Sequence, residues 1–563
     1  MKRGLEGGDG LDRVSVFARR QRIKNLEQWA LYAIIVESFF LALAPQVASA
    51  AVMFGVIAWF LRKQIDTRYK MLSLPFDVPV ALYLLIGAVS VLLSSARSFE
   101  LIYNYCTMVG TFGLTYLIVG QTIRTPAQVK QVAEALGASA IIVVLWGFFQ
   151  FLFGVDAADI KWTDPEAFPE LRKRVFSTLE NPNVLAGYLD VFICLALGLL
   201  AKVGNRSQKM ILLVAIIMFV ACLVMTYSRG AFLTLVVVLA VYGVLQDWRI
   251  VAFLAIVTGL IAYNDSMFLN RIMSSFNMGD SSEGVRVGIW VSTSAMIADH
   301  PFAGIGWGAY QYVYPQYNYY VADPDIVIYH AHNLYLNCAA EVGILGALAF
   351  FWYFFGTMFT TLALDSNERY VKGTTALIAR LEAFLNKSPA FQYLTELRAL
   401  VETRLTAFAD EVIKLLPFGR KQPPLKLKKS RKHYKEVVHN DELNFSERTR
   451  KKFADDKPAP DAVAEEVTTE EKITIGGEKI SIKSVQIKTE HENKEPPAKD
   501  DTTELDDKQF LDGFKLGIGL AFLSMALNGF TDDLLFNIPS SMLMWLLGAL
   551  AAAIDKIKHG QGR

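Results

Sequence analysis

The chain has 563 residues, of which 53% are hydrophobic and 20% are charged, and its formal net charge is +1. Soluble globular proteins rarely combine this length with this hydrophobicity. The small net charge says little about partners, because the charges are segregated along the chain. Long apolar runs occupy roughly 29–363 and 511–555, and most charged residues lie elsewhere. The composition therefore predicts an integral membrane protein.

The first apolar run follows a basic N-terminal segment, 1–28, and no small-residue cleavage site obviously follows it. We therefore expect an uncleaved first helix rather than a signal peptide. The four cysteines all lie in apolar runs, and none has a CxxC or metal-type spacing. We interpret them as small apolar residues, which say nothing about the redox compartment.

The apolar runs predict about twelve transmembrane helices, because a helix needs about 20 apolar residues to cross the ~30 Å hydrocarbon core. The predicted spans lie near 29–44, 46–61, 78–95, 101–121, 133–153, 184–201, 210–227, 230–246, 249–263, 333–362, 511–530 and 539–555.

Two of these runs are too long for one crossing and need a break. Pro45 separates the first two spans, and proline disfavours a continuous helix. Residues 210–245 would extend to ~54 Å as one helix, at 1.5 Å per residue. The polar tripeptide Ser228-Arg229-Gly230 interrupts this run, so we predict a tight hairpin there.

The basic loops predict the orientation. Positive residues favour the cytoplasmic side, and with twelve spans the short basic loops all fall on one side together with both termini. The loop 264–332 carries only Arg271 and Arg286 against six acidic residues and falls on the opposite side. We therefore predict a cytoplasmic N-terminal segment at 1–28, transmembrane spans within 29–363, and a large external loop at 264–332.

Residues 364–510 have a different composition. The stretch 373–416 has helical spacing, a basic run follows at 420–435, and 440–507 is rich in Lys, Glu, Asp, Thr and Pro. A stretch with the composition of 440–507 buries too little apolar surface to fold alone. We predict a cytoplasmic insertion that is helical and then disordered, followed by the last two spans and a cytoplasmic tail at 511–563. The predicted fold is an all-α, polytopic transmembrane helical bundle.

Two arginines could bind an anion on the external side. Arg229 lies at the tip of the predicted hairpin, where positive charge is unusual, and Arg286 lies on a helical stretch of the external loop. The alternative for Arg229 is a side chain at the membrane interface that extends its charge into water. The alternative for Arg286 is an ordinary charged residue on the surface of a helix.

His332 directly precedes a long apolar run, which predicts a position at the outer mouth of a span. Histidine suits a general base, because its unperturbed pKa lies near neutrality. The alternative is an interfacial histidine that satisfies a helix end. His330 could bind a metal with His332, but side chains at i and i+2 do not face one way on a helix. No external acidic cluster completes such a site, so we expect no metal.

Arg174 and Asn183 precede another span. Both could contact substrate. Asn183 could also cap the following helix, and capping is the favoured role.

These segments occur in a fixed order. They are RVFSTLENPNVLAGYL (174–189), TYSRGAFLTL (226–235), RVGIW with HPFAGIGWGAYQ (286–311), and HAHNLYLNCAAEVGILG (330–346). The series resembles the O-antigen ligase and polymerase family over roughly 170–362.

The resemblance implies transfer of a glycan from undecaprenyl diphosphate to an acceptor at the outer face of the bacterial inner membrane. It implies that Arg229 and Arg286 hold the diphosphate and that His332 is the base. It also implies inversion at the anomeric carbon and no requirement for a metal, cofactor or nucleotide. The expected partners are a lipid-linked glycan donor, a lipid A–core or other glycan acceptor and membrane lipids, with no nucleic acid.

Four functions stay open at this point. We favour a ligase that moves the glycan to a lipid A–core sugar. The alternatives are a polymerase that joins lipid-linked repeat units, a transferase that glycosylates a protein hydroxyl, and a polysaccharide transporter without chemistry. If the protein were a transporter, we would expect polar residues halfway through the membrane in several spans. Here the polar candidates cluster at the outer edge, which favours chemistry at the membrane surface.

Overall fold

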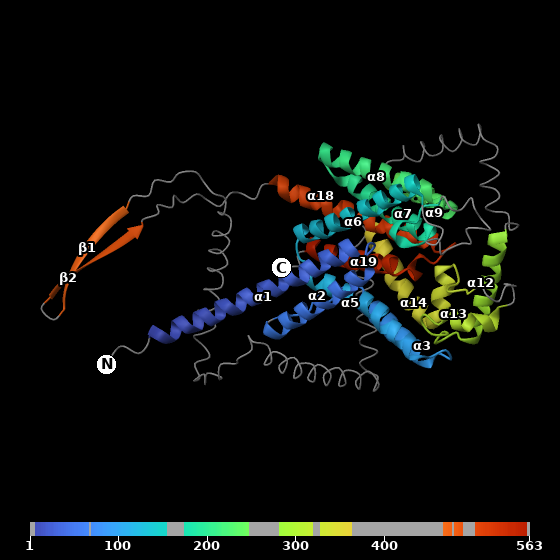
Figure 1. Ribbon diagram of the computed structural model, residues 1–563, viewed down its shortest axis with the longest axis horizontal. Helices are drawn as coiled ribbons and strands as arrows, with labels where there is room; N and C mark the ends of the chain where they lie inside the picture. The colour runs from blue at the N-terminus through green and yellow to red at the C-terminus, as the bar shows by residue number, and fades with distance from the viewer. Residues whose placement is uncertain are drawn as a thin grey trace. The chain divides into compact units, whose positions relative to one another are not determined.

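The computed structural model describes residues 6–66, 69–154, 174–246, 281–318, 327–362, 466–475, 478–487 and 501–559. The chain divides into two units. The first comprises Met1–Asp410 and Asp506–Arg563, and the second comprises Glu411–Leu505. The first unit is a bundle of helices (Figure 1).

The helices of the first 154 residues are α1 (Glu6–Phe40), α2 (Pro45–Ile65), α3 (Asp77–Leu93), α4 (Phe99–Asn104), the π-helix η1 (Tyr105–Val109), α5 (Gly110–Thr122) and α6 (Pro126–Phe153). The helices after residue 173 are η4 (Ser177–Leu179), α7 (Pro182–Lys202), α8 (Arg206–Thr226), α9 (Arg229–Gln246), α12 (Ser281–Asp299), α13 (Tyr310–Val313), η5 (Tyr314–Tyr317), α14 (Leu334–Leu362), α18 (Asp501–Asn528), η6 (Leu534–Phe536) and α19 (Ile538–Lys558).

The helical membrane fold is confirmed. Within the described ranges, nine helices are long and apolar enough to cross a membrane, and α3 is a shorter apolar helix. Every predicted span coincides with a helix except 249–263, which lies outside the described residues. The predicted span 29–44 corresponds to the C-terminal part of the longer helix α1. The chain is therefore a multi-pass membrane protein, and the count of twelve crossings stays a prediction.

Both predicted breaks are present. Pro45 occupies the first turn of α2, where a missing N–H costs nothing. Helix α8 ends at Thr226, Tyr227 adopts a left-handed conformation with φ 52°, and α9 begins at Arg229. Arg229 therefore stands at the N-terminal end of a helix, as the hairpin prediction required.

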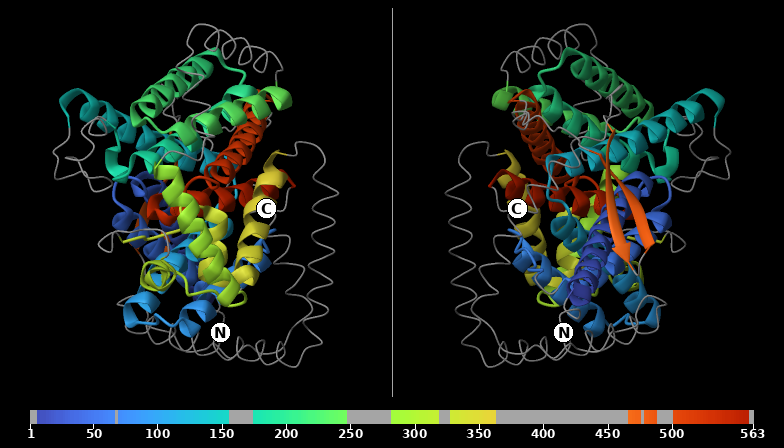
Figure 2. Two further views of the ribbon diagram at one scale, coloured as in Figure 1. Left: turned by 90° about the vertical axis from the view of Figure 1, so that its right-hand side faces the viewer. Right: turned by 90° about the vertical axis from the view of Figure 1, so that its left-hand side faces the viewer.

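Helices α7, α18 and α19 form the centre of the bundle. Within the described part of the chain, the apolar 18-residue stretch of α19 is 89% buried, and those of α7 and α18 are each 78% buried. The corresponding stretch of α8 is only 22% buried. Figure 2 shows α18 and α19 enclosed by the other helices. Glycines let α7 and α18 approach closely, because a Cβ at Gly198 would lie 2.2 Å from the amide nitrogen of Gly517. The central helices are thus held at backbone contact.

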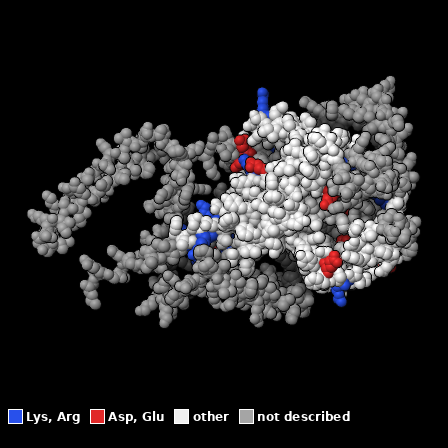
Figure 3. Space-filling view, in the orientation of Figure 1, with Lys and Arg blue, Asp and Glu red and all other residues white. Residues whose placement is uncertain are grey.

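Basic side chains gather at one end of the bundle. Arg19 on α1 donates to the carbonyl of Ile65 at the end of α2 (3.0 Å), and Lys130 on α6 pairs with Asp507 on α18 (2.6 Å). In Figure 3 the described surface of the bundle is largely uncharged, and Lys and Arg cluster where α1 and α2 lie. The assignment of this end to the cytoplasmic side stays a prediction.

Helix α14 reverses direction at Gly343, which has non-helical angles of φ 71° and ψ 172°. The ring of Tyr335 lies 5.3 Å from that of Phe351, centroid to centroid. A straight helix would separate these residues by ~24 Å, at 1.5 Å per residue. The predicted span 333–362 is therefore a short half-helix, 334–342, that folds back on the membrane-length segment 344–362.

The loop that follows α12 satisfies the backbone groups freed by this reversal. The amide of Ile305 donates to Ala340 O (2.8 Å), and that of Gly306 donates to Glu341 O (3.0 Å). The amide of Ile344 donates to Pro301 O (2.8 Å). Unpaired backbone groups are costly at membrane depth, so this pairing stabilises the reversal. It also fixes α12, which carries Arg286, against α14.

In the second unit, β1 (Glu466–Ile475) pairs with β2 (Glu478–Ile487) in an antiparallel hairpin. The hairpin lies within 440–507, which was expected to be disordered. Alternating β-branched residues, as in ITI at 473–475 and ISI at 480–482, explain the strands. The helical part predicted for the insertion lies outside the described residues.

We expect Gly343→Ala to destabilise the bundle. The observed backbone angles are essentially restricted to glycine, and an added Cβ would lie 2.2 Å from Phe302 O. This conformation alone costs a residue other than glycine about 1–3 kcal/mol. Thermal unfolding of the purified protein in detergent measures the loss. Gly137→Ala in α6, where a Cβ meets nothing within 4 Å, is the control. Equal unfolding temperatures for both variants would contradict the assigned reversal.

Candidate active site

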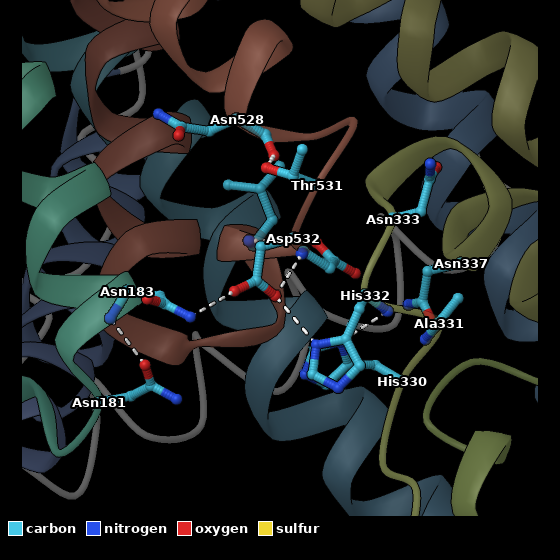
Figure 4. Close-up of polar contacts among 12 residues, drawn as sticks. Asn181, Asn183, His330, Ala331, His332, Asn333, Asn337, Asn528, Thr531 and Asp532 are labelled. Carbon is cyan, nitrogen blue, oxygen red and sulfur yellow. Dashed lines mark hydrogen bonds and ion pairs between the residues drawn. The ribbon is translucent and has the colours of Figure 1, made fainter. Parts of the chain in front are cut away.

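Asp532 lies between two of the residues singled out from the sequence. One of its carboxylate oxygens is 3.2 Å from Nδ1 of His332. The other accepts a hydrogen bond from the side chain of Asn183 (3.4 Å). Figure 4 shows Asp532 reaching toward both side chains, from a loop that lies about 200 residues away from His332 in sequence. A carboxylate thus connects the N-terminal ends of α7 and α14.

The segment that carries His332 is tied down on both sides. Asn333 caps the half-helix, because its side-chain oxygen accepts from the amides of Tyr335 and Leu336 (3.0 Å each). The amide of Leu334 donates to the carbonyl of Gly529, just beyond α18 (2.8 Å). His332 itself has a left-handed φ of 48°. Its ring is therefore positioned by the reversal of α14 and by the end of α18.

Two neighbouring carboxyl groups in the loop after α18 differ in their surroundings. Burial acts to raise the pKa of Asp532, but the hydrogen bond and charge of His332 outweigh it, and the pKa lies well below its usual range. Arg286 contributes to this lowering. Burial and the adjacent charge of Asp532 raise the pKa of Asp533 to about 7. Asp532 is thus the carboxylate that stays ionised beside the histidine.

Arg174 links this carboxylate to a second helix junction. Its Nε donates to Thr226 O at the end of α8 (2.7 Å), and its Nη2 donates to the side-chain oxygen of Asn183 (2.7 Å). Burial, together with the charges of Arg229 and Arg286, lowers the pKa of Arg174 to about 10. Arg229 and Arg286 are therefore both close enough to Arg174 for their positive charges to act on it.

All the residues predicted for the site come together. Arg229 is exposed at the start of α9, and Arg286 lies on α12. Their charges act on Arg174 and, for Arg286, also on His330 and Asp532. The result is a cationic cluster around one carboxylate and one partly exposed histidine, whose side chain is 35% exposed.

The capping role favoured for Asn183 is wrong. Asn181 caps α7, because its side-chain oxygen accepts the amide of Asn183 (2.8 Å). Pro182 lies in the first turn, so the cap stands one residue before it. The side chain of Asn183 is consequently available to bind Arg174 and Asp532, which leaves it in the site.

His330 lies beside His332, although the sequence analysis placed it facing away. Residues 330–333 are not helical, and the two ring centroids are 4.1 Å apart. Nδ1 of His330 accepts the amide hydrogen of His332 (3.2 Å), and its ring stacks on Phe536 at 4.5 Å. Burial and the charge of His332 lower the pKa of His330 to about 3. His330 is thus a neutral ring that holds the main chain at His332.

A metal site has to be considered, because Asp532 adds a carboxylate beside the two histidines. Ligand atoms of His330, His332 and Asp532 lie within 4.8 Å of one another. Nδ1 of His330 already accepts a backbone hydrogen bond, so Nε2 carries the proton of this neutral ring and offers no lone pair. The neighbouring arginines also repel a cation. The cluster fits an anion better than a divalent metal.

Asp532 and Asp533 were missed because they follow the predicted insertion, far in sequence from the other motifs. The available signal was two acidic residues in the short loop 531–538, which the orientation prediction placed on the external side. Spatial proximity to His332 could not be inferred without knowing that α18 packs beside α14.

The cluster combines a partly exposed histidine, paired with a carboxylate, with several positive charges. Such an arrangement can remove a proton from a hydroxyl group while stabilising negative charge on a phosphate-type leaving group.

Residues 213–351 match the family model described as O-antigen ligase. This part of the chain is therefore similar to the O-antigen ligase family. The matched part contains Arg229, Arg286 and His332, whereas Arg174, Asn183 and Asp532 lie outside it. No curated protein matches the chain. The predicted resemblance is confirmed for this stretch, and the match supports a function of the O-antigen ligase or polymerase type.

The low pKa of His330 predicts a pH-dependent stability. Between about pH 6.5 and pH 3, the unfolded chain binds a proton at this histidine and the folded protein does not. The contribution of neutral His330 to stability is therefore present above pH 6.5 and is lost as the pH falls. We expect unfolding temperatures measured at pH 7, 6 and 5 to fall less steeply in His330→Asn, which keeps an acceptor for the His332 amide. Identical slopes would contradict the burial of a neutral ring.

Proposed function

We propose that this protein is an O-antigen ligase that transfers a glycan from undecaprenyl diphosphate to a lipid A–core sugar. The reaction would take place at the periplasmic face of the bacterial inner membrane. The observation that carries the proposal is the His332–Asp532 pair beside a cluster of arginines. The family match of residues 213–351 supports the lipid-linked substrate.

The arginines account for the donor. A diphosphate carries negative charge, and guanidinium groups bind phosphate oxygens in a bidentate manner. Arg229 and Arg286 are the proposed diphosphate ligands. Arg174 is anchored to Thr226 O and Asn183, so it contributes a fixed positive charge and holds Asn183 in place. As the bond to the sugar breaks, charge builds on the diphosphate, and preorganised positive groups stabilise that charge.

His332 and Asp532 account for activation of the acceptor. Donation of the Nδ1 hydrogen to the carboxylate leaves the lone pair of Nε2 to accept a proton. The acceptor hydroxyl loses its proton to Nε2 as its oxygen forms a bond to the anomeric carbon. The bond from that carbon to the diphosphate oxygen breaks, and undecaprenyl diphosphate leaves. A single displacement inverts the anomeric centre and needs no metal or nucleotide.

Deletion of the gene in the source bacterium, followed by gel analysis of its glycolipids, tests the proposed acceptor. A ligase deletion leaves full-length polymer on the lipid carrier and a bare lipid A–core. Single repeats on the core would instead indicate a polymerase. A loss of glycan from proteins alone would indicate a protein hydroxyl as the acceptor. Unchanged surface glycan would refute all three, and the transporter alternative would be supported by a donor that stays on the cytoplasmic side.

Substitutions in the purified protein test the assigned roles. A general base contributes ~10²–10⁴-fold, so His332→Ala should remove most turnover while donor binding survives. Arg229→Ala and Arg286→Ala should weaken donor binding and lower turnover by ~10²–10³-fold. Lysine at either position should rescue little, because an ammonium group cannot form the bidentate contact. Turnover and donor affinity are measured with a lipid-linked glycan and isolated core acceptor.

Arg97→Ala is the matched control for the arginine variants. Arg97 is exposed in the loop between α3 and α4, on the predicted external side, and donates to Leu92 O (3.1 Å). It should transfer glycan normally. Near wild-type transfer by His332→Ala would show that another group is the base. A uniform loss across all variants, Arg97→Ala included, would show that folding rather than chemistry is affected.

A further inference from the structure

Behind the site, one buried hydrogen-bonded group joins three helices. It consists of Asp190 on α7, Thr234 on α9 and Asn528 at the end of α18, and we call it the clasp. The side-chain nitrogen of Asn528 donates to Asp190 (3.1 Å), and its oxygen accepts from the hydroxyl of Thr234 (3.2 Å). The three residues are 0%, 5% and 5% exposed. The clasp is therefore closed to solvent.

We propose that the clasp is a positioning device for glycan transfer. It would hold Arg229, Asn183 and Asp532 at fixed separations. The proposal rests on the proposed function for its effect on catalysis. Its geometric part, that the clasp fixes the ends of α9 and α18, stands independently of what the site does.

Two of the clasp residues, Thr234 and Asp190, lie one to two helical turns after a site residue on the same helix. Thr234 follows Arg229 by ~7.5 Å along α9, and Asp190 follows Asn183 by ~10.5 Å along α7, at 1.5 Å per residue. These are short lengths of regular helix, so the two residues on each helix move together. A displacement of a clasp residue therefore also displaces the site residue on the same helix.

Asn528 is connected to the site through its own backbone. Its carbonyl accepts the amides of Thr531 and Asp532, at 3.0 Å each. These bonds form the turn that places the Asp532 carboxylate beside His332. One residue thus bonds to α7 and α9 with its side chain and holds the Asp532 turn with its main chain.

The ends of α9 and α18 also touch at the level of the site. A Cβ at Gly230, next to Arg229, would lie 3.1 Å from the hydroxyl of Thr531, next to Asp532. The distance between a diphosphate ligand and the residue that orients the base is set at this contact. A misplacement of ~1 Å can cost ~10²-fold in rate, so this separation has to be maintained.

The simpler explanation is that the clasp only satisfies buried polar groups. Such groups need partners inside a membrane protein, wherever they lie. Thr115 on α5 provides the matched comparison, because its hydroxyl donates to the buried carboxyl of Glu37 on α1 (2.6 Å). Thr115→Val and Thr234→Val each remove one buried threonine hydrogen bond at constant volume. Neither Thr115 nor Glu37 belongs to the described site.

Disulfide cross-linking measures the geometry without any glycan. Gly230→Cys and Thr531→Cys are introduced after the four native cysteines have been replaced by alanine. Disulfides form only within a narrow range of Cβ separation, so the rate reports how often the two ends are in register. We expect Thr234→Val to slow cross-linking on the order of five-fold. Thr234→Ser, which keeps the hydroxyl, and Thr115→Val should cross-link at the parent rate.

Steady-state kinetics, with the native cysteines present, measure the consequence for transfer. We expect Thr234→Val to lower kcat about ten-fold, because the base and the donor ligands lose their alignment. The KM for the acceptor should stay within about two-fold, because the clasp lies behind the site rather than in the acceptor path. Thr234→Ser should restore kcat. Asp190→Asn, which keeps an acceptor oxygen for Asn528, should behave like Thr234→Ser.

The outcomes separate the two proposals. Slower cross-linking and lower kcat in Thr234→Val alone support the clasp. Unchanged cross-linking, or the same losses in Thr115→Val, would overturn it. Slower cross-linking in a protein whose parent form transfers no glycan would leave the positioning device in place and refute the proposed function instead.

Discussion

The reversal of α14 depends on backbone hydrogen bonding. A helix that ends inside a membrane protein exposes carbonyl and amide groups that no lipid can satisfy. The half-helix 334–342 is tolerated because the loop at 301–306 pairs with both sides of Gly343. Without that pairing, α14 would continue straight and carry His332 away from α18. The position of the proposed base, His332, therefore depends on the hydrogen bonds between the loop at 301–306 and the C-terminal end of the half-helix.

The positive charges near His332 determine which ligands the site can bind. The charges of Arg229 and Arg286 act on Arg174, and that of Arg286 also acts on His330 and Asp532. Guanidinium groups bind phosphate oxygens in a bidentate manner, so these positive charges favour a diphosphate as the ligand in the proposed transfer. The same positive charges disfavour a divalent metal at the neighbouring histidines.

The sequence identified most of the spans because apolar length is a local property. It identified Arg229, Arg286 and His332 because each stands in a short motif beside an apolar run. It did not reveal the reversal at Gly343, since a glycine inside an apolar stretch carries no sign of the loop that pairs with it. Asp532 was missed because its partner is about 200 residues away. Asn183 was assigned to capping because Asn181 and Asn183 flank the same proline, and only the geometry shows which one caps.

The carboxyl groups of Asp532 and Asp533 differ in pKa. This difference affects where a proton taken up by His332 in the proposed transfer could go. Asp532 has a pKa well below its usual range, so in the proposed transfer it would remain ionised as His332 takes a proton. It therefore stabilises the charged imidazole by electrostatic attraction and does not relay the proton. Asp533, with a pKa near 7, has its side chain engaged in capping η6, where it accepts the amide of Leu535 (3.2 Å). The side chain of His332 is 35% exposed, so in the proposed transfer a proton on Nε2 can pass to solvent rather than to either carboxyl group.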